Sequence, residues 1–211
     1  ALKEAYRDKL TVYYGIEWDI LSESNLPDYD YVIGSIHQVE LHGELFCVDA
    51  SPETTSAYLR KYQDITPDAA AEAYFAQYAA LAQVAAVDIV GHFDLLTKFD
   101  ELNDFYHADS PRFLAAAKGA MDALVLAGKI FEINTGAISR GYRTMPYPSR
   151  ALLTELKRIN GRITISSDSH SARTVAYGFD AAERLALDCG FTEAWVFDGK
   201  GFVPEPLGKK E

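Results

Sequence analysis

The sequence predicts an α/β fold in which strands and helices alternate around a parallel sheet or barrel. Short apolar runs bounded by turn or polar residues are typical of buried strands. Six such runs occur, at residues 10–17, 31–36, 88–91, 130–134, 163–166 and 194–197. Segments with helical start and stop signals separate them, and this alternation indicates βαβ units. The chain has 211 residues, 48% of them hydrophobic, which is enough for one sizeable core.

The helices between these strands are predicted from their capping residues. Three Ser-Pro or Thr-Pro pairs place an N-cap residue before a proline at the first helical position, at Ser51-Pro52, Thr66-Pro67 and Ser110-Pro111. Residues 69–86 are rich in alanine and have strong helical propensity. Helices are also expected at 150–159 and 179–189. Since no repeat or linker interrupts the pattern, we expect one domain over residues 1–203 and a fraying polar tail at 204–211.

Charge and composition exclude several classes of protein. The 20 basic and 31 acidic residues give a net charge of −11, which repels nucleic acid at long range. No apolar run reaches the roughly 18–20 residues of a membrane helix, and the first twenty residues show no signal-peptide pattern. Cys47 and Cys189 are too few for a disulfide scaffold and favour a reduced, cytoplasmic setting. A small anionic substrate stays open, because metal ions or one arginine can invert the local field.

Side chains that can bind metals follow the predicted strands at their carboxyl ends, the edge where ligands gather in parallel α/β folds. Four of the five core strands end at such residues, which are Glu17, His37, His92 and the pair Asp168 and His170. Asp168 and His170 are two residues apart, so an extended chain points both to one face. Each residue alone is weak evidence, because a strand end often carries a solvated carboxylate or a structural histidine. Together, these imidazole and carboxylate groups suit Zn²⁺, Mn²⁺ or Fe²⁺.

The remaining polar residues are less informative. Arg140 and Arg143 follow the fourth strand closely. His42 either lines a substrate pocket or lies in a surface loop. His107 is expected to be structural. Three further carboxylates are expected to be solvated: Glu40, Asp94 and Asp100. The chain has no Gly-rich dinucleotide fingerprint, no phosphate-binding GxxxxGK[ST] loop and no nucleophile elbow. Neither cysteine has an evident catalytic context.

Five motifs follow one another along the chain: Gly15-Ile-Glu-Trp-Asp19, Tyr31-Val-Ile-Gly-Ser-Ile-His37, Asp88-Ile-Val-Gly-His92, Glu132-Ile-Asn-Thr-Gly136 and Ser167-Asp-Ser-His170. In these motifs and their order the chain resembles the PHP superfamily, whose name joins polymerases and histidinol phosphatases. The stretch 132–149 most resembles the signature of the histidinol-phosphatase branch. The resemblance runs across nearly the whole chain, and the five motifs are specific as a set.

The resemblance implies a distorted seven-stranded β/α barrel with up to three divalent ions, Zn, Mn or Fe, at its C-terminal face. Glu17 matches the family's bridging carboxylate, and His37 and His92 match the two imidazoles that share one metal with it. Asp168 matches a ligand of a second metal and His170 a ligand of the third. Glu17 and Asp168 are therefore the expected catalytic residues.

The resemblance also implies a small phosphorylated substrate. Arg140 or Arg143 matches an arginine that grips the substrate phosphate, and His42 is the third candidate for the substrate pocket. The substrate in the resembling branch is L-histidinol phosphate, which is hydrolysed in histidine biosynthesis. Two alternatives stay open: another PHP-type phosphoesterase with a different small phosphate, or a non-catalytic scaffold or binding module. A metal-dependent amide hydrolase is a weaker third.

The chain departs from the family pattern at its start. The family's first strand carries a His-x-His pair, and this sequence begins about where the third strand of the family would. We expect a barrel that lacks its first two βα units, roughly 60 residues at about 30 per unit. The strand at 10–17 would then have an unpaired edge, which favours self-association. A chain with this gap is expected to be nearly inactive alone.

Overall fold

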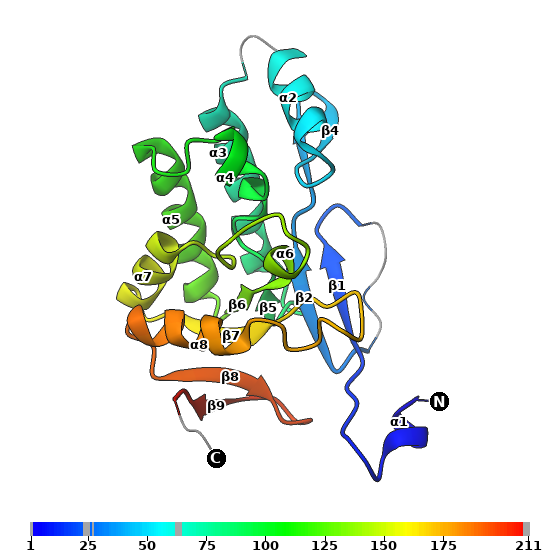
Figure 1. Cartoon of the computed structure of the whole chain (residues 1–211). Helices are drawn as coiled ribbons and strands as arrows, with labels where there is room; N and C mark the ends of the chain where they lie inside the picture. Colours follow the sequence, from blue (N-terminus) through cyan, green and yellow to red (C-terminus); the bar gives the residue numbers. More distant parts are fainter. Residues whose placement is uncertain (1, 23–25, 27, 62–64, 209–211) are drawn as a thin grey trace.

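A five-stranded parallel sheet forms the centre of the protein in a computed structural model, which describes all residues except 1, 23–25, 27, 62–64 and 209–211 (Figure 1). The strands, in spatial order, are β1 (Gly15–Asp19), β2 (Tyr31–Ser35), β5 (Ile89–Val90), β6 (Ile130–Asn134) and β7 (Arg162–Ser166). Every neighbouring pair is parallel. The carboxyl ends of all five strands therefore lie at the same edge of the sheet.

The helices alternate with these strands, as the capping residues predicted. The longer ones are α2 (Pro52–Lys61), α3 (Pro67–Ala80), α5 (Pro111–Leu126), α7 (Arg150–Arg158) and α8 (Phe179–Asp188); the shorter ones are α1 (Leu2–Tyr6), α4 (Asp100–Asn103), α6 (Gly136–Ser139) and the 3₁₀ turns η1 (Leu81–Gln83) and η2 (Leu95–Thr97). Thr66 caps α3 by accepting a hydrogen bond from the Ala69 amide, and Ser110 caps α5 through the Phe113 amide. The expected helix at 69–86 ends earlier, because the chain tightens into η1.

The core anchors the loops that carry the site. Helix α3 packs on α5, and α5 packs on α7 (Figure 1). The ring of Phe75 on α3 lies 5.1 Å from those of Phe93 and Phe113, and Phe93 lies 5.3 Å from Phe131 on β6. Phe93 is fully buried and directly follows His92. This packing fixes the start of the loop after β5, where a histidine was predicted to act.

Two antiparallel hairpins stand outside the central sheet. One consists of β3 (Gln38–Leu41) and β4 (Glu44–Cys47), and the other of β8 (Glu193–Phe197) and β9 (Phe202–Pro206). The prediction of a polar tail from residue 204 is wrong for residues 204–206, which pair with β8. An edge strand tolerates prolines because only one side of it needs main-chain donors.

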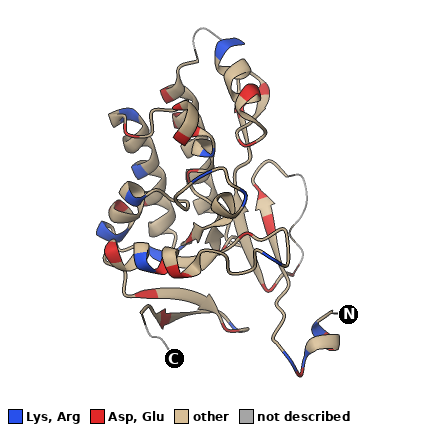
Figure 2. Ribbon diagram, in the orientation of Figure 1, with Lys and Arg blue, Asp and Glu red and all other residues tan. Residues whose placement is uncertain are grey.

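The sheet is open among the described residues, and β1 has the unpaired edge that was predicted for the strand at 10–17. The sheet has five strands among the described residues, with β1 and β7 at its edges. The strand expected at 10–17 begins only at Gly15, because its pairing with β2 starts at Gly15 and Tyr31. Figure 2 shows basic and acidic residues interspersed along the outer helices. No helix within the described ranges is long and apolar enough to cross a membrane.

Candidate metal centre

Three side chains that can bind a metal ion, from three neighbouring strands, meet at the carboxyl edge of the sheet. The Oε1 atom of Glu17 lies 2.8 Å from His92 Nε2 and 3.3 Å from His37 Nε2. The two imidazole rings are 5.0 Å apart, centroid to centroid. One donor atom from each of the three residues lies within 4.8 Å of the others, the only such triad found in the described part of the chain.

Main-chain and carboxylate contacts hold the two imidazoles in place. The main-chain amide of His37, just after β2, donates to Asp19 Oδ2 over 2.8 Å, and the ring Nδ1 lies 3.5 Å from the same oxygen. The amide of His92, just after β5, donates to Oε2 of the buried Glu132 over 2.8 Å. Glu132 also accepts a hydrogen bond from Asn134. Each imidazole thus projects its Nε2 toward Glu17 from a fixed backbone position.

The electrostatics of the triad favour a charged carboxylate. Burial alone would raise the pKa of Glu17, but hydrogen bonds with His37 and His92 hold that pKa well below its usual range. Burial opposes protonation of His37, yet contacts with Asp19 and Glu17 raise its pKa to about 10. The pKa of His92 is also raised, because the Glu17 carboxylate outweighs the burial of the ring. A divalent cation would compete with the protons on these two imidazoles for the same anionic oxygen and ring nitrogens, because a metal-bound imidazole is neutral.

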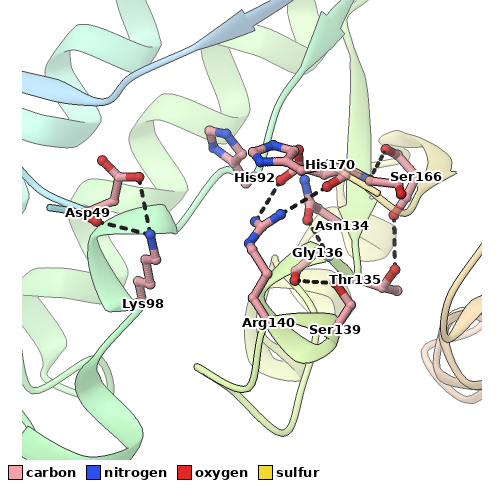
Figure 3. A network of polar contacts seen from close by, with 12 residues as sticks. Asp49, His92, Lys98, Asn134, Thr135, Gly136, Ser139, Arg140, Ser166 and His170 are labelled. Atoms are coloured by element: carbon pink, nitrogen blue, oxygen red, sulfur yellow. Dashed lines mark hydrogen bonds and ion pairs between the residues drawn. The ribbon is translucent and has the colours of Figure 1, made fainter. Parts of the chain in front are cut away.

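A second polar group faces this triad from the end of β7. Asp168 Oδ1 lies 3.2 Å from His170 Nε2. Arg140, at the C-terminal end of α6, donates from Nη2 to Asp168 Oδ2 and from Nη1 to the Asp168 carbonyl oxygen, each over 2.9 Å. Figure 3 shows Arg140 extending from α6 toward His170. Asp168 adopts a positive φ of 41°, a strained conformation for a non-glycine residue that is often found at functional sites.

One cavity of about 220 Å³ joins the two groups. Its lining includes all five residues predicted to bind metals, together with Arg140, Asp49, Lys98, Leu95 and Tyr142. Lys98 Nζ donates to the carbonyl oxygen of Asp49 over 2.9 Å and lies 3.3 Å from its carboxylate (Figure 3). The Lys98 ammonium also sits 4.8 Å from the centre of the Tyr142 ring. Two cations, Arg140 and Lys98, therefore line the same cavity as the carboxylates and imidazoles.

Two of the predicted substrate residues do not line this cavity. His42 is exposed in the turn between β3 and β4, where it adopts a φ of 53°. Arg143 is buried instead: it donates to Thr97, and its guanidinium stacks 4.4 Å above the Tyr147 ring. Of the two arginines predicted as candidates for the substrate pocket, only Arg140 lines this cavity.

Four other polar residues differ in how far they are buried. Asp94 is fully buried and Asp100 is partly buried, so the prediction that they are solvated is wrong. Glu40 is exposed, as predicted. His107 is exposed and pairs with Asp104 at the surface over 3.0 Å, away from the cavity.

Sequence reasoning missed three residues of the site. Asp19 lies two residues after Glu17 on β1, so strand periodicity would have placed both on one face. Lys98 and Asp49 carried no such signal, because no predicted strand ends at either. They meet only because η2 brings Lys98 to the loop that follows β4.

The residues present fit a divalent metal ion. A carboxylate with two imidazoles is a donor set that binds Zn²⁺ and related ions, and catalytic zinc sites commonly use three protein ligands. In Glu17, His37 and His92, the donor atoms already face one another across hydrogen-bond distances. Asp19 and Glu132, which contact the histidines or their main chain, are the kind of outer groups that orient metal ligands.

Two solved bacterial structures share this arrangement of elements. A histidinol phosphate phosphatase (HisK) of Lactococcus lactis, crystallised with zinc, L-histidinol and phosphate, matches with a TM-score of 0.68 and 23% identity, over 96% of this chain and 75% of that one. The chain has the fold of that phosphatase. A protein of Listeria monocytogenes described as "putative histidinol phosphatase hisK" matches with the same TM-score and 18% identity, over 85% of this chain and 71% of that one.

A yeast protein is similar to this chain in sequence. A protein of Schizosaccharomyces pombe named "Probable histidinol-phosphatase" is 28% identical over an alignment of 215 residues, gaps included. The alignment spans 96% of this chain and 69% of that protein. No family model matches the chain. The sequence match and the fold match thus point to proteins of the same name by separate comparisons.

Proposed function

We propose that this chain is a metal-dependent phosphatase that hydrolyses L-histidinol phosphate to L-histidinol and phosphate in histidine biosynthesis. One observation carries the proposal: carboxylates, imidazoles and two cationic side chains line a single small cavity at the carboxyl edge of the sheet. The name of the yeast relative, and the L-histidinol and phosphate bound to the Lactococcus lactis enzyme, support L-histidinol phosphate as the substrate. The chain is then a phosphoric monoester hydrolase of the PHP type.

Glu17, His37 and His92 would hold one divalent ion in this proposal, and Asp168 and His170 would serve further ions, up to three in all. Bound ions of this kind lower the pKa of water and neutralise phosphate oxygens. Zinc is supported by the Lactococcus lactis structure, and manganese and iron suit the same mixed donors. Glu17 contributes the central anionic oxygen, and Asp19 keeps His37 turned toward it.

The cationic residues would bind the substrate phosphate. Arg140 presents a planar fork that can hold two phosphate oxygens, and its present partners, the Asp168 carboxylate and carbonyl, show that it reaches this wall of the cavity. Lys98 adds a second positive charge, fixed by Asp49 and by the ring of Tyr142. The polar wall formed by Asp49 offers an acceptor to the amino or imidazole group of an L-histidinol moiety.

Three further expectations belong to the proposal: the barrel, self-association and a cytoplasmic setting. The parallel order of the sheet and its polar carboxyl edge are consistent with a seven-stranded β/α barrel of the PHP type. Strand β1 lies at an edge of the sheet, which supports self-association through that edge. The free cysteines Cys47 and Cys189 are consistent with a cytoplasmic enzyme.

Phosphate release measured over a panel of small phosphomonoesters tests this function. With zinc or manganese present, we expect the highest kcat/KM for L-histidinol phosphate. Glu17→Gln should reduce the rate to background, whereas Glu40→Gln, at an exposed position on β3, should leave it unchanged. Preference for another phosphate would replace the substrate but keep the chemistry. A chain that binds metal but hydrolyses none of the esters would instead be a binding module.

A further inference from the structure

Residues 141–146, which follow α6, form a strap along one wall of the candidate site. The strap begins after Arg140, and it ends where Tyr147 exchanges two main-chain hydrogen bonds with Asn134, over 2.8 and 3.0 Å. Tyr142, near the start of the strap, lines the same cavity of about 220 Å³ as the carboxylates and imidazoles. The position of the strap therefore decides where this wall of the cavity lies.

The strap also has a hollow behind it. A second cavity, of about 360 Å³, is lined by Thr144, Met145 and Pro146 together with residues of α8. Dense packing of side chains normally fixes a segment inside a protein. A segment that lies between two cavities has less packing to hold it, so specific contacts must set its position.

Side chains of the strap contact η2 and the residues that follow it. The Tyr142 ring lies 4.8 Å from the Lys98 ammonium and 5.7 Å from the Phe99 ring, centroid to centroid for the two rings. The buried side chain of Arg143 donates to Thr97. A cation is attracted to the face of an aromatic ring at such a distance. Through Tyr142, the position of the strap thus acts directly on the Lys98 ammonium in the substrate cavity.

Glu101 on α4 holds the main chain of the strap. The Thr144 amide donates to both of its carboxylate oxygens, each over 2.9 Å, and Glu101 Oε1 lies 3.9 Å from Arg143 Nε. Between Tyr142 and Tyr147, the Thr144 amide is the one main-chain donor with an acceptor in the described part of the chain. Hydrogen bonds to a carboxylate are stronger than those between neutral groups. Glu101 is not among the residues that line the substrate cavity, so its effect on the substrate must pass through the strap.

We infer that Glu101 is a positioning residue, which latches the strap and so keeps Tyr142 against Lys98 for substrate binding. The inference rests on the proposed function, in which Lys98 supplies a positive charge to the substrate phosphate. Without the latch, the strap is free to move toward the cavity behind it, and Tyr142 then leaves Lys98. The metal-binding triad of Glu17, His37 and His92 is carried by β1 and by the ends of β2 and β5, so it should not move with the strap.

Steady-state kinetics on variants of the whole chain test this role. Glu101→Ala should raise KM for L-histidinol phosphate about tenfold, the factor that corresponds to one lost hydrogen bond to a charged group, and should change kcat less. Glu101→Gln keeps an oxygen that can accept from the Thr144 amide, so it should recover most of the wild-type KM. Glu72→Gln is the matched control and should leave the kinetics unchanged. Glu72 is also an exposed glutamate that accepts two hydrogen bonds, both from Arg112, and neither of these residues lines the cavity.

Two further measurements distinguish positioning from a loss of stability. In a Tyr142→Ala background, Glu101→Ala should raise KM no further, because residues that act through one contact are not additive. Amide hydrogen exchange of Thr144, followed by NMR, should be faster in Glu101→Ala than in the wild type. Zinc affinity, from competition with a chromophoric chelator, should be equal in both proteins.

The outcomes separate this inference from the proposed function. An unchanged KM in folded Glu101→Ala, an equal rise of KM in the Tyr142→Ala background, or unchanged exchange of the Thr144 amide would overturn the role of Glu101. If Glu101→Ala does not fold, Glu101→Asp decides, since it keeps the charge but shortens the side chain that reaches the amide; a wild-type KM there overturns the latch. A wild type that hydrolyses no phosphomonoester would refute the proposed function, and the exchange rates of Thr144 would still test the latch.

Discussion

Gly136 is the position where one added methyl group should damage the site without damaging the fold. It begins α6, and its amide donates to Asn134 Oδ1. A Cβ atom at this position would lie 2.8 Å from both Arg140 Nη2 and Asp168 Oδ2, and 3.0 Å from Arg140 Nη1. Ordinary contacts of a Cβ begin at 3.4 Å, so each of the two nearest atoms must retreat by about 0.6 Å.

The size of the effect follows from the contacts that must move. Arg140 and Asp168 are joined by charge-assisted hydrogen bonds over 2.9 Å, a kind of bond worth about 1.5–3 kcal/mol. If the same placement serves phosphate and metal, losing it should lower kcat/KM about 10- to 150-fold, since about 1.4 kcal/mol is a factor of ten. The fold should tolerate the change, because alanine is favoured over glycine in helices by about 1 kcal/mol.

Gly119→Ala provides the matched control. Gly119 lies within α5 and is exposed, and a Cβ there would meet nothing within 4 Å. This variant should keep kcat/KM for L-histidinol phosphate and gain about 1 kcal/mol in the free energy of unfolding, measured by urea titration. The reasoning is refuted if Gly136→Ala retains the activity of the wild type, or if it loses activity only because it unfolds.

Three other changes have expected outcomes. Arg140→Ala should raise KM for the phosphomonoester and lower kcat/KM about 10- to 150-fold in steady-state kinetics, whereas Arg143→Ala should mainly lower thermal stability. A larger loss of kcat/KM in Arg143→Ala than in Arg140→Ala would contradict the proposal that Arg140 binds the phosphate. Asp19→Asn should weaken zinc binding about 10- to 100-fold in chelator competition by releasing His37, and equal affinity would show that the tether is unnecessary. Burial raises the pKa of Asp100 from 3.8 to about 6. Between pH 4 and 6 the folded state therefore holds a proton on Asp100 that the unfolded state has lost, so the free energy of unfolding should fall as the pH rises through this range. Asp100→Asn should therefore gain about 1–2 kcal/mol at pH 7, less than the full shift implies because the residue is partly solvated, and gain nothing at pH 4 in urea titrations.

The sequence predicted the central strands well because each is a short apolar run between turn residues. Strand β6 occupies the expected residues, and β2 ends one residue early. The β3–β4 hairpin was missed, although His42 and Gly43, both with positive φ, form the two-residue turn that such hairpins favour. Strand β9 was missed because Pro204 and Pro206 argue against a strand unless it lies at an edge.

Placement of the site could be predicted only where strand ends determine it. The carboxyl ends of parallel strands lie at one edge of the sheet, so the sequence alone predicts that Glu17, His37 and His92 lie close together. Burial of Arg143 and Asp94 could not be predicted, because it depends on how the loops after β5 and β6 fold over each other. For charged side chains, local sequence gives the chemistry, whereas tertiary packing decides whether they face the cavity or the interior.

Anomalous diffraction from crystals of the zinc-loaded chain tests the central claim most directly. The account predicts an anomalous peak at the zinc edge bonded to Glu17 Oε1, His37 Nε2 and His92 Nε2, with metal–ligand distances of about 2.0–2.2 Å. The Glu17–His92 hydrogen bond of 2.8 Å would then be replaced by coordination. A fully loaded crystal with no peak in this cavity, or with zinc only at surface carboxylates, would contradict the metal centre and the phosphatase built on it.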